Sequence, residues 1–261
     1  MVEIRAIYVL WLREIKKLSR AKERIIGSVA MPLIFLVFLG FSFSGAEIPG
    51  LDKDLKYINF LVPGIIGMNM LFSSMFSGIS VLWDKEFGFL KEIMVAPVSR
   101  VSIALGRIAG GASTGLMQGI ILFSLSFFFG FTFGPGFSLF RAFAGSILML
   151  VFMLLISLVF ISLGLSFASN MRDAEGFELI INLVMFPLFF LSGAVSPIST
   201  LPTWVRYVAY ANPLTYGVDG IRGALVGFSM FPLMLDLLIC VLSSIIMVSI
   251  AAFFFDRSES V

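Results

Sequence analysis

The residue types that most often do chemistry in proteins are almost missing from this chain. It has no histidine, and its single cysteine is Cys240. A His/Cys zinc site, a Cys–His catalytic pair and a disulfide scaffold therefore cannot form within one chain. The sequence predicts no catalytic residue and no metal site.

Ionisable side chains are also rare inside the long apolar segments. A charge within a bilayer is costly, so such residues usually mark ion or proton pathways. Asp236 is the clearest example, and its place near the end of the last apolar segment predicts that water reaches it. No segment carries the paired carboxylates or buried lysine of a proton relay, or the two aspartates of an intramembrane protease. The pattern disfavours a titrating carrier and a membrane enzyme.

The composition is that of a membrane protein. Hydrophobic residues make up 59% of the 261 residues and charged residues 13%, with a mean hydropathy of +1.05, whereas soluble domains have about 45–50% and about 25%. The 18 basic and 16 acidic residues give a net charge of +2, too small a field to collect a nucleic acid. Water-soluble enzymes, disordered proteins and nucleic-acid binders are excluded.

Six segments are long and apolar enough to cross a membrane, which takes about 20 residues for about 30 Å of hydrocarbon. The predicted fold is an all-α integral membrane protein with a six-helix domain over 25–255. The expected spans are about 25–45, 60–82, 107–131, 142–168, 179–196 and 232–255.

Lys and Arg residues set the expected orientation. Thirteen fall on the side that holds both termini and five on the other, and the richer side is cytoplasmic. We therefore expect a multi-pass protein of the cell membrane with both ends inside, including a short tail at 256–261. The charged N-terminal segment has no signal-peptide cleavage pattern, so the first span is expected to be retained.

The N-terminal segment 1–24 is expected to be an amphipathic interface helix, helical over 3–20. Its apolar face consists of Ile4, Ile7, Tyr8, Trp11, Ile15 and Leu18. Basic residues occupy the other face, a pattern typical of a helix that lies along a membrane surface. Either this helix only enforces the topology, or it also contacts a cytoplasmic partner.

The second span has a small face and a weakly polar face. The small face consists of Gly64, Gly67, Leu71, Ser74 and Gly78. The polar face consists of Asn69, Ser73, Phe76, Ser77 and Ser80. Both patterns fit helix packing in lipid, and the polar one also fits a transport pathway. The candidate path residues are Asn69, Phe72, Ser73 and Phe76, with Phe186, Phe189 and Phe190 of the fifth span.

Two further helix features concern packing and shape. The third span repeats glycine at 106, 110, 111, 115 and 119, which indicates close small-residue packing. Pro187 in the fifth span is expected to kink or break that helix. The aromatic residues around Pro187 either line a greasy path or face lipid.

Two loops are unusual. In the cytoplasmic loop 83–102, Asp84 is expected to cap a short helix that Pro97 ends, with Phe87 and Leu90 on its apolar face. That face needs to be buried against the bundle or a soluble partner. The external stretch 192–227 is rich in proline, tyrosine and tryptophan, which predicts short helices that dip into the outer leaflet.

The chain resembles the permeases of type 2 ATP-binding-cassette (ABC) exporters, and especially the drug-resistance and nodulation-export branch. The matching runs are LVPGI at 61–65, EFGFLKEIMVAPVSR at 86–100 and FPLFFLSGAVSPISTLPTWVRYVAYANPLTYGVDGIR at 186–222. The chain departs from the pattern at Lys85, where relatives often have Arg, and at Phe89, where they often have Thr.

The resemblance implies a coupling helix within 84–97 that inserts into a separate ATPase subunit. The coupling residues would be Asp84, Glu86, Phe87, Gly88, Leu90 and Lys91. Spans two and five would line a path between two permease copies, identical or closely related. A re-entrant segment at 197–227 would form an outer gate with Pro197, Pro202, Trp204, Asn212, Pro213 and Tyr216.

The same resemblance implies an exporter of hydrophobic or amphipathic molecules such as drugs or lipids. The sequence contains no G-x-x-x-x-G-K-[ST] phosphate-binding loop, so ATP and Mg²⁺ are expected on the partner ATPase and no cofactor on this chain. The alternatives are a permease for polysaccharide or glycolipid export, and a secondary transporter that works alone.

Overall fold

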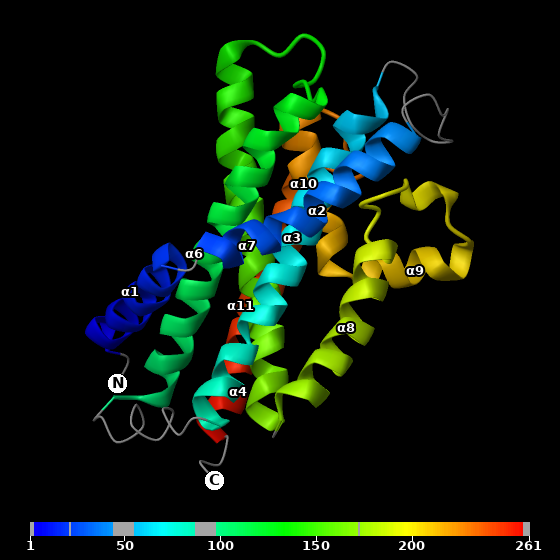
Figure 1. Cartoon of the computed structure of the whole chain (residues 1–261). Helices are drawn as coiled ribbons and strands as arrows, with labels where there is room; N and C mark the ends of the chain where they lie inside the picture. Colours follow the sequence, from blue (N-terminus) through cyan, green and yellow to red (C-terminus); the bar gives the residue numbers. More distant parts are fainter. Residues whose placement is uncertain (1–2, 21, 44–54, 87–97, 172, 258–261) are drawn as a thin grey trace.

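The computed structural model describes residues 3–20, 22–43, 55–86, 98–171 and 173–257, and these ranges contain helices and no strand. The helices before the third span are α1 (Ile4–Arg20), α2 (Lys22–Ser42), α3 (Tyr57–Ser77) and α4 (Ile79–Glu86). The third span and the helices after it are α6 (Arg100–Ser126), η1 (Phe127–Phe129), α7 (Leu139–Asn170), α8 (Ala174–Leu191), η2 (Ile198–Thr200), α9 (Thr203–Ala211), α10 (Pro213–Val226) and α11 (Leu233–Arg257). Figure 1 shows the long helices side by side in one bundle.

Six helical segments of the described chain are long and apolar enough to cross a membrane. They are Ile25–Ser42, Tyr57–Asp84, Arg100–Phe129, Leu139–Asn170, Ala174–Leu191 and Leu233–Arg257. The prediction of an all-α protein with six spans is therefore confirmed. The expected interface helix at 3–20 is α1, which lies along α6 at one end of the bundle (Figure 1).

Two span boundaries differ from the sequence prediction. The third span begins at Arg100 rather than near 107, because the Ser99 hydroxyl caps it by accepting the Ser102 backbone N–H at 3.2 Å. Arg107, which the sequence placed at the very start of the span, therefore lies well inside α6. The fifth span starts earlier, capped by Asp173, and α8 continues through Pro187 without a break.

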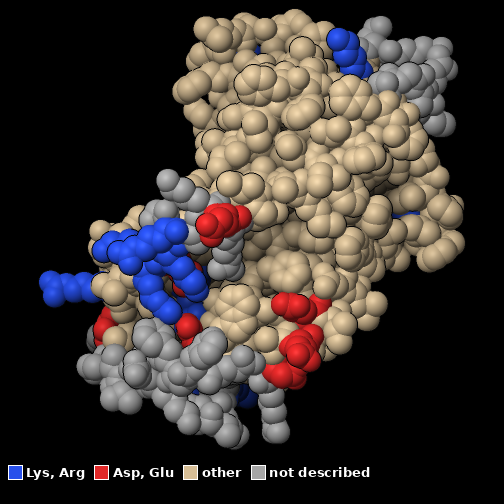
Figure 2. Space-filling model, viewed as in Figure 1, with Lys and Arg blue, Asp and Glu red and all other residues tan. Residues whose placement is uncertain are grey.

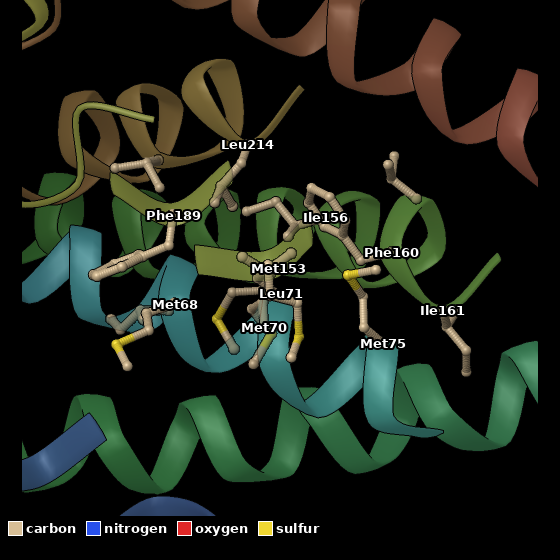
Figure 3. Packing of buried hydrophobic residues seen from close by; sticks show 14 of the residues in the cluster. Met68, Met70, Leu71, Met75, Met153, Ile156, Phe160, Ile161, Phe189 and Leu214 are labelled. Atoms are coloured by element: carbon tan, nitrogen blue, oxygen red, sulfur yellow. The ribbon is translucent and has the colours of Figure 1, made fainter. Parts of the chain in front are cut away.

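Helix α3 is the centre of the bundle. Every residue from Tyr57 to Leu71 is buried except Ile58, and the helix contacts α2, α6, α7, α8 and α10. Figure 3 shows Met70 and Met75 of α3 facing Met153 and Phe160 of α7. Methionine is flexible and fills irregular gaps, which suits a helix with neighbours on every side.

Small residues let the other helices approach α3 and α6 closely. Gly64 of α3 lies against the backbone of Ala194, and Gly67 lies against the Val218 side chain of α10. On α6, Gly106 and Gly110 lie against α1. The glycines at 111, 115 and 119 lie against α3 and α7. The predicted packing role of these glycines is confirmed.

Short helices connect the fifth and sixth spans, as predicted for the re-entrant segment 197–227. Helix α10 is buried against α7, α3 and α11, whereas α9 lies at the side of the molecule (Figure 1). Trp204 on α9 is 73% exposed, which fits an aromatic residue at a membrane interface.

Charged side chains are concentrated towards one end of the molecule. On the face shown in Figure 2, Lys and Arg gather near α1, a group of Asp and Glu lies near the lower end of α8, and the wide surface above them is largely uncharged. This separation is typical of a bundle whose middle is immersed in lipid and whose ends meet water.

The crossing of the α3–α4 junction with α7 gives a prediction about stability. A Cβ atom on Gly78 would lie 2.6 Å from the Gly164 carbonyl carbon, and one on Gly164 would lie 2.5 Å from the Met75 carbonyl oxygen. Backbone atoms cannot rotate away, so Gly164→Ala is expected to lower the free energy of unfolding by about 1–3 kcal/mol. Thermal unfolding in detergent measures the change.

Gly27 on α2 provides the matched control, because a Cβ atom there would meet nothing within 4 Å. Gly27→Ala should leave the unfolding temperature unchanged or raise it, since alanine favours the helix by about 1 kcal/mol. Equal stability of the Gly164→Ala protein and the parent would contradict the close crossing.

Candidate functional site

An ion cluster joins three helices at the α1 end of the bundle. The Asp84 carboxylate of α4 accepts a hydrogen bond from the Arg107 guanidinium of α6 at 2.5 Å and one from Arg13 of α1 at 3.3 Å. The Arg107 and Asp84 side chains are 6% and 13% exposed, and Arg13 is 32% exposed. Asp84 thus lies inside a helix, and the expectation that it caps a helix starting at 85 is wrong.

The cluster neutralises the positive charge of the Arg107 guanidinium, which is buried in the bundle. Breaking a buried ion pair by removing one partner costs about 3–5 kcal/mol, because the other charge stays buried. Arg107 lies within an apolar span, and Asp84 neutralises it. The interaction holds the end of the α3–α4 segment against α6.

Helix α1 is attached to α6 at further points. The Trp11 indole N–H donates to the Ser113 hydroxyl at 2.9 Å, and the Glu3 backbone N–H donates to the Ser102 hydroxyl at 2.8 Å. Because Ser102 and Ser113 lie three turns apart on α6, α1 is fixed along its length. The three contacts make α1 and α6 one unit.

The rest of the predicted coupling set is not placed. Phe87, Gly88, Leu90 and Lys91 lie outside the described residues, as does the side chain of Glu86. Asp84 is the one member of the set whose side chain is described, and its ion partners Arg13 and Arg107 belong to this chain. The coupling role of these residues stays a prediction.

A cavity of about 260 Å³ lies between α1, α2, α3 and α6. Four of the predicted path residues line it, namely Asn69, Phe72, Ser73 and Phe76 of α3. Ser77 and Ser80 extend the same polar stripe along the cavity. The polar face that the sequence left open between packing and a pathway therefore borders an open space.

The three predicted path residues on α8 do not line this cavity. They meet its wall through Phe72, whose ring is 5.4 Å from the Phe186 ring and 6.5 Å from the Phe189 ring, centroid to centroid. Phe190 stacks on Phe186 at 6.4 Å. One aromatic cluster thus links α3 to α8 beside the cavity.

The far wall of the cavity was not predicted from the sequence. Thr114 and Gln118 of α6 face it, together with Glu14 and Lys17 of α1 and Met31 of α2. A signal was present, because Gln118 is the only glutamine of the chain and lies in an apolar span, one helical turn from Thr114. The glycine stripe on the same helix hid this polar pair.

A second ion pair lies at the opposite end of the bundle. Arg222 of α10 is 3.7 Å from the Asp219 carboxylate, and it donates to the carbonyl oxygens of Phe60 at 3.3 Å and Gly193 at 3.0 Å. Its guanidinium also lies 3.7 Å from the centre of the Phe60 ring, a cation–π geometry. The sequence counted Arg222 among external loop residues, but it is 4% exposed.

Asp219 fixes the turn that leads into the last span. Its carboxylate accepts the backbone N–H groups of Met230 at 2.7 Å and Phe231 at 2.9 Å. Arg222 and Asp219 together therefore connect α3, the turn after α8, and the α10–α11 turn. A small cavity of about 90 Å³, which Pro197 also lines, lies beside them.

Five of the six predicted gate residues fall into two groups, and the sixth, Pro197, lines the small cavity. Asn212 caps α10 by accepting the Leu214 N–H at 3.0 Å, and its amide donates to the Leu188 carbonyl of α8 at 2.7 Å. Pro213 is the first residue of α10, and the Tyr216 hydroxyl donates to the Tyr210 carbonyl at 2.8 Å. These three residues meet at the α8–α9–α10 junction. Pro202 and Trp204 instead start α9 at the side of the molecule.

Asp236 corrects a sequence expectation. It lies in the first turn of α11, as predicted, but it is fully buried rather than reached by water. Neither carboxylate oxygen has a hydrogen-bond partner among the described residues. The prediction failed because α10, read from sequence as an external segment, packs against α11 and covers this turn.

Known proteins resemble this chain over most of its length. The family model of the ABC-2 type transporter matches residues 5–226. The transport permease ycf38 of Pyropia yezoensis is 30% identical over 221 residues, which cover 84% of this chain and 73% of that protein. The inner membrane transport permease YadH of Escherichia coli K12 is 26% identical over 231 residues, or 87% of this chain and 86% of that protein.

A third relative is named for resistance to a drug. The daunorubicin resistance ABC transporter permease protein DrrB1 of Streptomyces coeruleorubidus is 25% identical over 229 residues, which cover 85% of this chain and 75% of that protein. The matched family region includes α1, the cavity helices and α10. The six-span bundle is thus a transport permease, and the chain belongs to the ABC-2 type transporter family.

Proposed function

We propose that this chain is the permease subunit of an ATP-driven exporter of hydrophobic or amphipathic molecules, such as drugs or lipids. A separate ATPase supplies the energy, and two permease copies form the membrane domain. The observation that carries the proposal is the cavity between α1, α2, α3 and α6, whose wall combines apolar side chains with an uncharged polar stripe. The drug-resistance name of DrrB1 supports the substrate class.

Helices α1 and α6 are proposed to transmit the movement. The ion cluster and the Trp11 and Glu3 hydrogen bonds make them one unit, and this unit forms one wall of the cavity. Helices α2 and α3 form the other wall. Nucleotide in the ATPase biases the population between two arrangements of these walls, because it binds one arrangement better than the other. The cavity opens and closes as a result.

The direct test is transport by the reconstituted complex. Vesicles that hold the permease and its ATPase should accumulate daunorubicin or a hydrophobic dye only with ATP, and an ATPase without its phosphate-binding lysine should abolish accumulation. Accumulation by the permease alone, driven by an ion gradient, would instead show a stand-alone carrier.

The ion cluster gives a prediction about coupling. Arg107→Met leaves the half-buried Asp84 with the partly exposed Arg13 as its remaining ion partner, so we expect the free energy of unfolding to fall by about 1–3 kcal/mol, the cost of a lost hydrogen-bond partner. Complexes that assemble should hydrolyse ATP with little transport, because Asp84 no longer ties α6 to α1. Size exclusion, ATPase rate and transport rate are measured together.

Arg5→Met is the matched control, since Arg5 is an exposed arginine of α1. It should change neither stability nor coupling, because exposed charges contribute at most about 1 kcal/mol. Arg107→Lys should restore part of the coupling. Full coupling in a stable Arg107→Met complex would refute the role of the cluster.

The orientation of the bundle gives a separate prediction. Lys56 and Arg20 are exposed and lie at opposite ends of the bundle, and the Lys/Arg distribution puts the Arg20 end inside. In intact cells, Lys56→Cys should react with an impermeant maleimide, and Arg20→Cys should react only after the membrane is opened. Native Cys240 is 2% exposed and should stay silent. Labelling of Arg20→Cys from outside would reverse the topology.

A further inference from the structure

Two amide side chains in the wall of the α1–α2–α3–α6 cavity have hydrogen-bonding atoms that the protein does not use. Asn69 of α3 and Gln118 of α6 are 2% and 3% exposed, and both line the cavity. Within the described residues, neither Asn69 Nδ2 nor Gln118 Oε1 has a partner. One unused atom is a donor and the other is an acceptor, and they come from opposite walls.

Such atoms are unusual in a membrane bundle. Buried polar groups are nearly always paired, because an unpaired one loses its hydrogen bond to water and gains nothing. Both atoms have almost no accessible surface in this structure. The last torsions of Asn and Gln rotate easily, so a turn of each amide brings Asn69 Nδ2 and Gln118 Oε1 into the cavity. This arrangement fits a ligand that supplies both an acceptor and a donor.

The remaining lining defines the charge and polarity of that ligand. Hydroxyl groups of Ser73, Ser77, Ser80 and Thr114 continue the polar stripe, and Met68, Phe72, Phe76 and Pro32 make the rest apolar. Among the described residues, the charged lining residues are Glu14 and Lys17 of α1, which have opposite signs. A buried ion would find no counter-charge at the amides, so the group seated there is uncharged.

The cavity also indicates where an apolar chain lies. Met31 of α2 lines it and is 49% exposed, so the cavity is bordered by a residue that reaches the outer surface of the bundle. At about 260 Å³ it is slightly smaller than the usual range of about 300–1,000 Å³ for ligand pockets. It therefore suits the polar end of an amphipathic molecule, with the chain passing Met31 towards the lipid.

We infer that this cavity binds the uncharged polar end of an amphipathic molecule, such as a carboxamide, which accepts a hydrogen bond from Asn69 and donates one to Gln118. The inference deepens the proposed exporter function and rests on it for the role of the ligand as cargo. Binding itself does not depend on ATP, so the two claims can be tested separately.

The test uses three amphiphiles with the same twelve-carbon chain. N-dodecylacetamide has a donor and an acceptor, N-dodecyl-N-methylacetamide has only the acceptor, and dodecyltrimethylammonium carries a charge. Each competes with a diazirine-bearing alkyl acetamide for photolabelling of the permease–ATPase complex in nanodiscs, without nucleotide. Affinities are corrected for partition into lipid, and labelled peptides are read by mass spectrometry.

N-dodecylacetamide should bind about tenfold more tightly than its N-methyl analogue, which is the effect of one buried hydrogen bond. The cation should bind more weakly still. The label should fall on peptides of α3 and α6.

Variants then assign each hydrogen bond. Gln118→Met should abolish the preference for the N–H compound, because no acceptor remains. Asn69→Leu should weaken both acetamides about tenfold and keep the preference between them. Asn182→Leu is the matched control, because Asn182 is an asparagine of α8 outside the cavity lining, and it should change nothing. If Gln118→Met does not fold, Asn69→Leu carries the test alone.

The outcomes separate the two proposals. Equal binding of all three amphiphiles, or no effect of Gln118→Met and Asn69→Leu, would mean that the two amides bond no ligand group and would overturn the inference, even in a complex that transports. Selective binding in a complex that shows no ATP-driven transport would support the binding site but refute the proposed exporter function.

Discussion

The stability of the bundle depends on hydrogen bonds and ion pairs within the protein, because lipid offers no partner to a buried polar group. The central helix α3 is buried along most of its length, and a buried arginine lies near each of its ends. At one end, Asp84 pairs with Arg107 at 2.5 Å. At the other, Arg222 donates to the Phe60 carbonyl at 3.3 Å. If either arginine is removed, the group that it contacts loses a hydrogen-bond donor, and no water is present to take the place of the arginine.

Between these two ends, α3 is held in place by close packing against its neighbours. Apolar side chains gain little from leaving lipid, so helix association there rests on close packing. Gly64, Gly67 and Gly78 let the neighbouring elements come close on one side. On the other side α3 borders the cavity with Asn69, Ser73 and Ser77. The helix is therefore rigid at its ends and on one face, and open along the other.

This asymmetry connects the structure to the proposed transport. The open face lies opposite α6, which α1 and Asp84 hold. A force on the α1 end therefore reaches the cavity wall without disturbing the glycine contacts on the other face. Unused hydrogen-bonding capacity at Asn69 and Gln118 remains where the walls face each other.

Much of the fold could be predicted from sequence, because each span is set by a long apolar run and the packing faces by glycine spacing. The polar face of α3 and the short helices after α8 were also visible. The contact partners of the buried charged residues could not be predicted. Arg107, Arg222 and Asp236 looked like residues of loops or ends, since a linear pattern cannot show that α4 returns to α6 or that α10 covers α11. Gln118 was hidden because Asn69, which lines the same cavity, lies on another helix.

The central claim is that the α1–α6 unit moves as one body against α2 during the ATP cycle. Spin-label distances measured by pulsed electron resonance test it directly, with labels on exposed residues of the reconstituted complex. The distance between Tyr8 of α1 and Met117 of α6 should stay constant when ATP is added, whereas the distance between Ile34 of α2 and Met117 should change. A change within the α1–α6 pair, or no change at α2 in a complex that transports, would contradict the account.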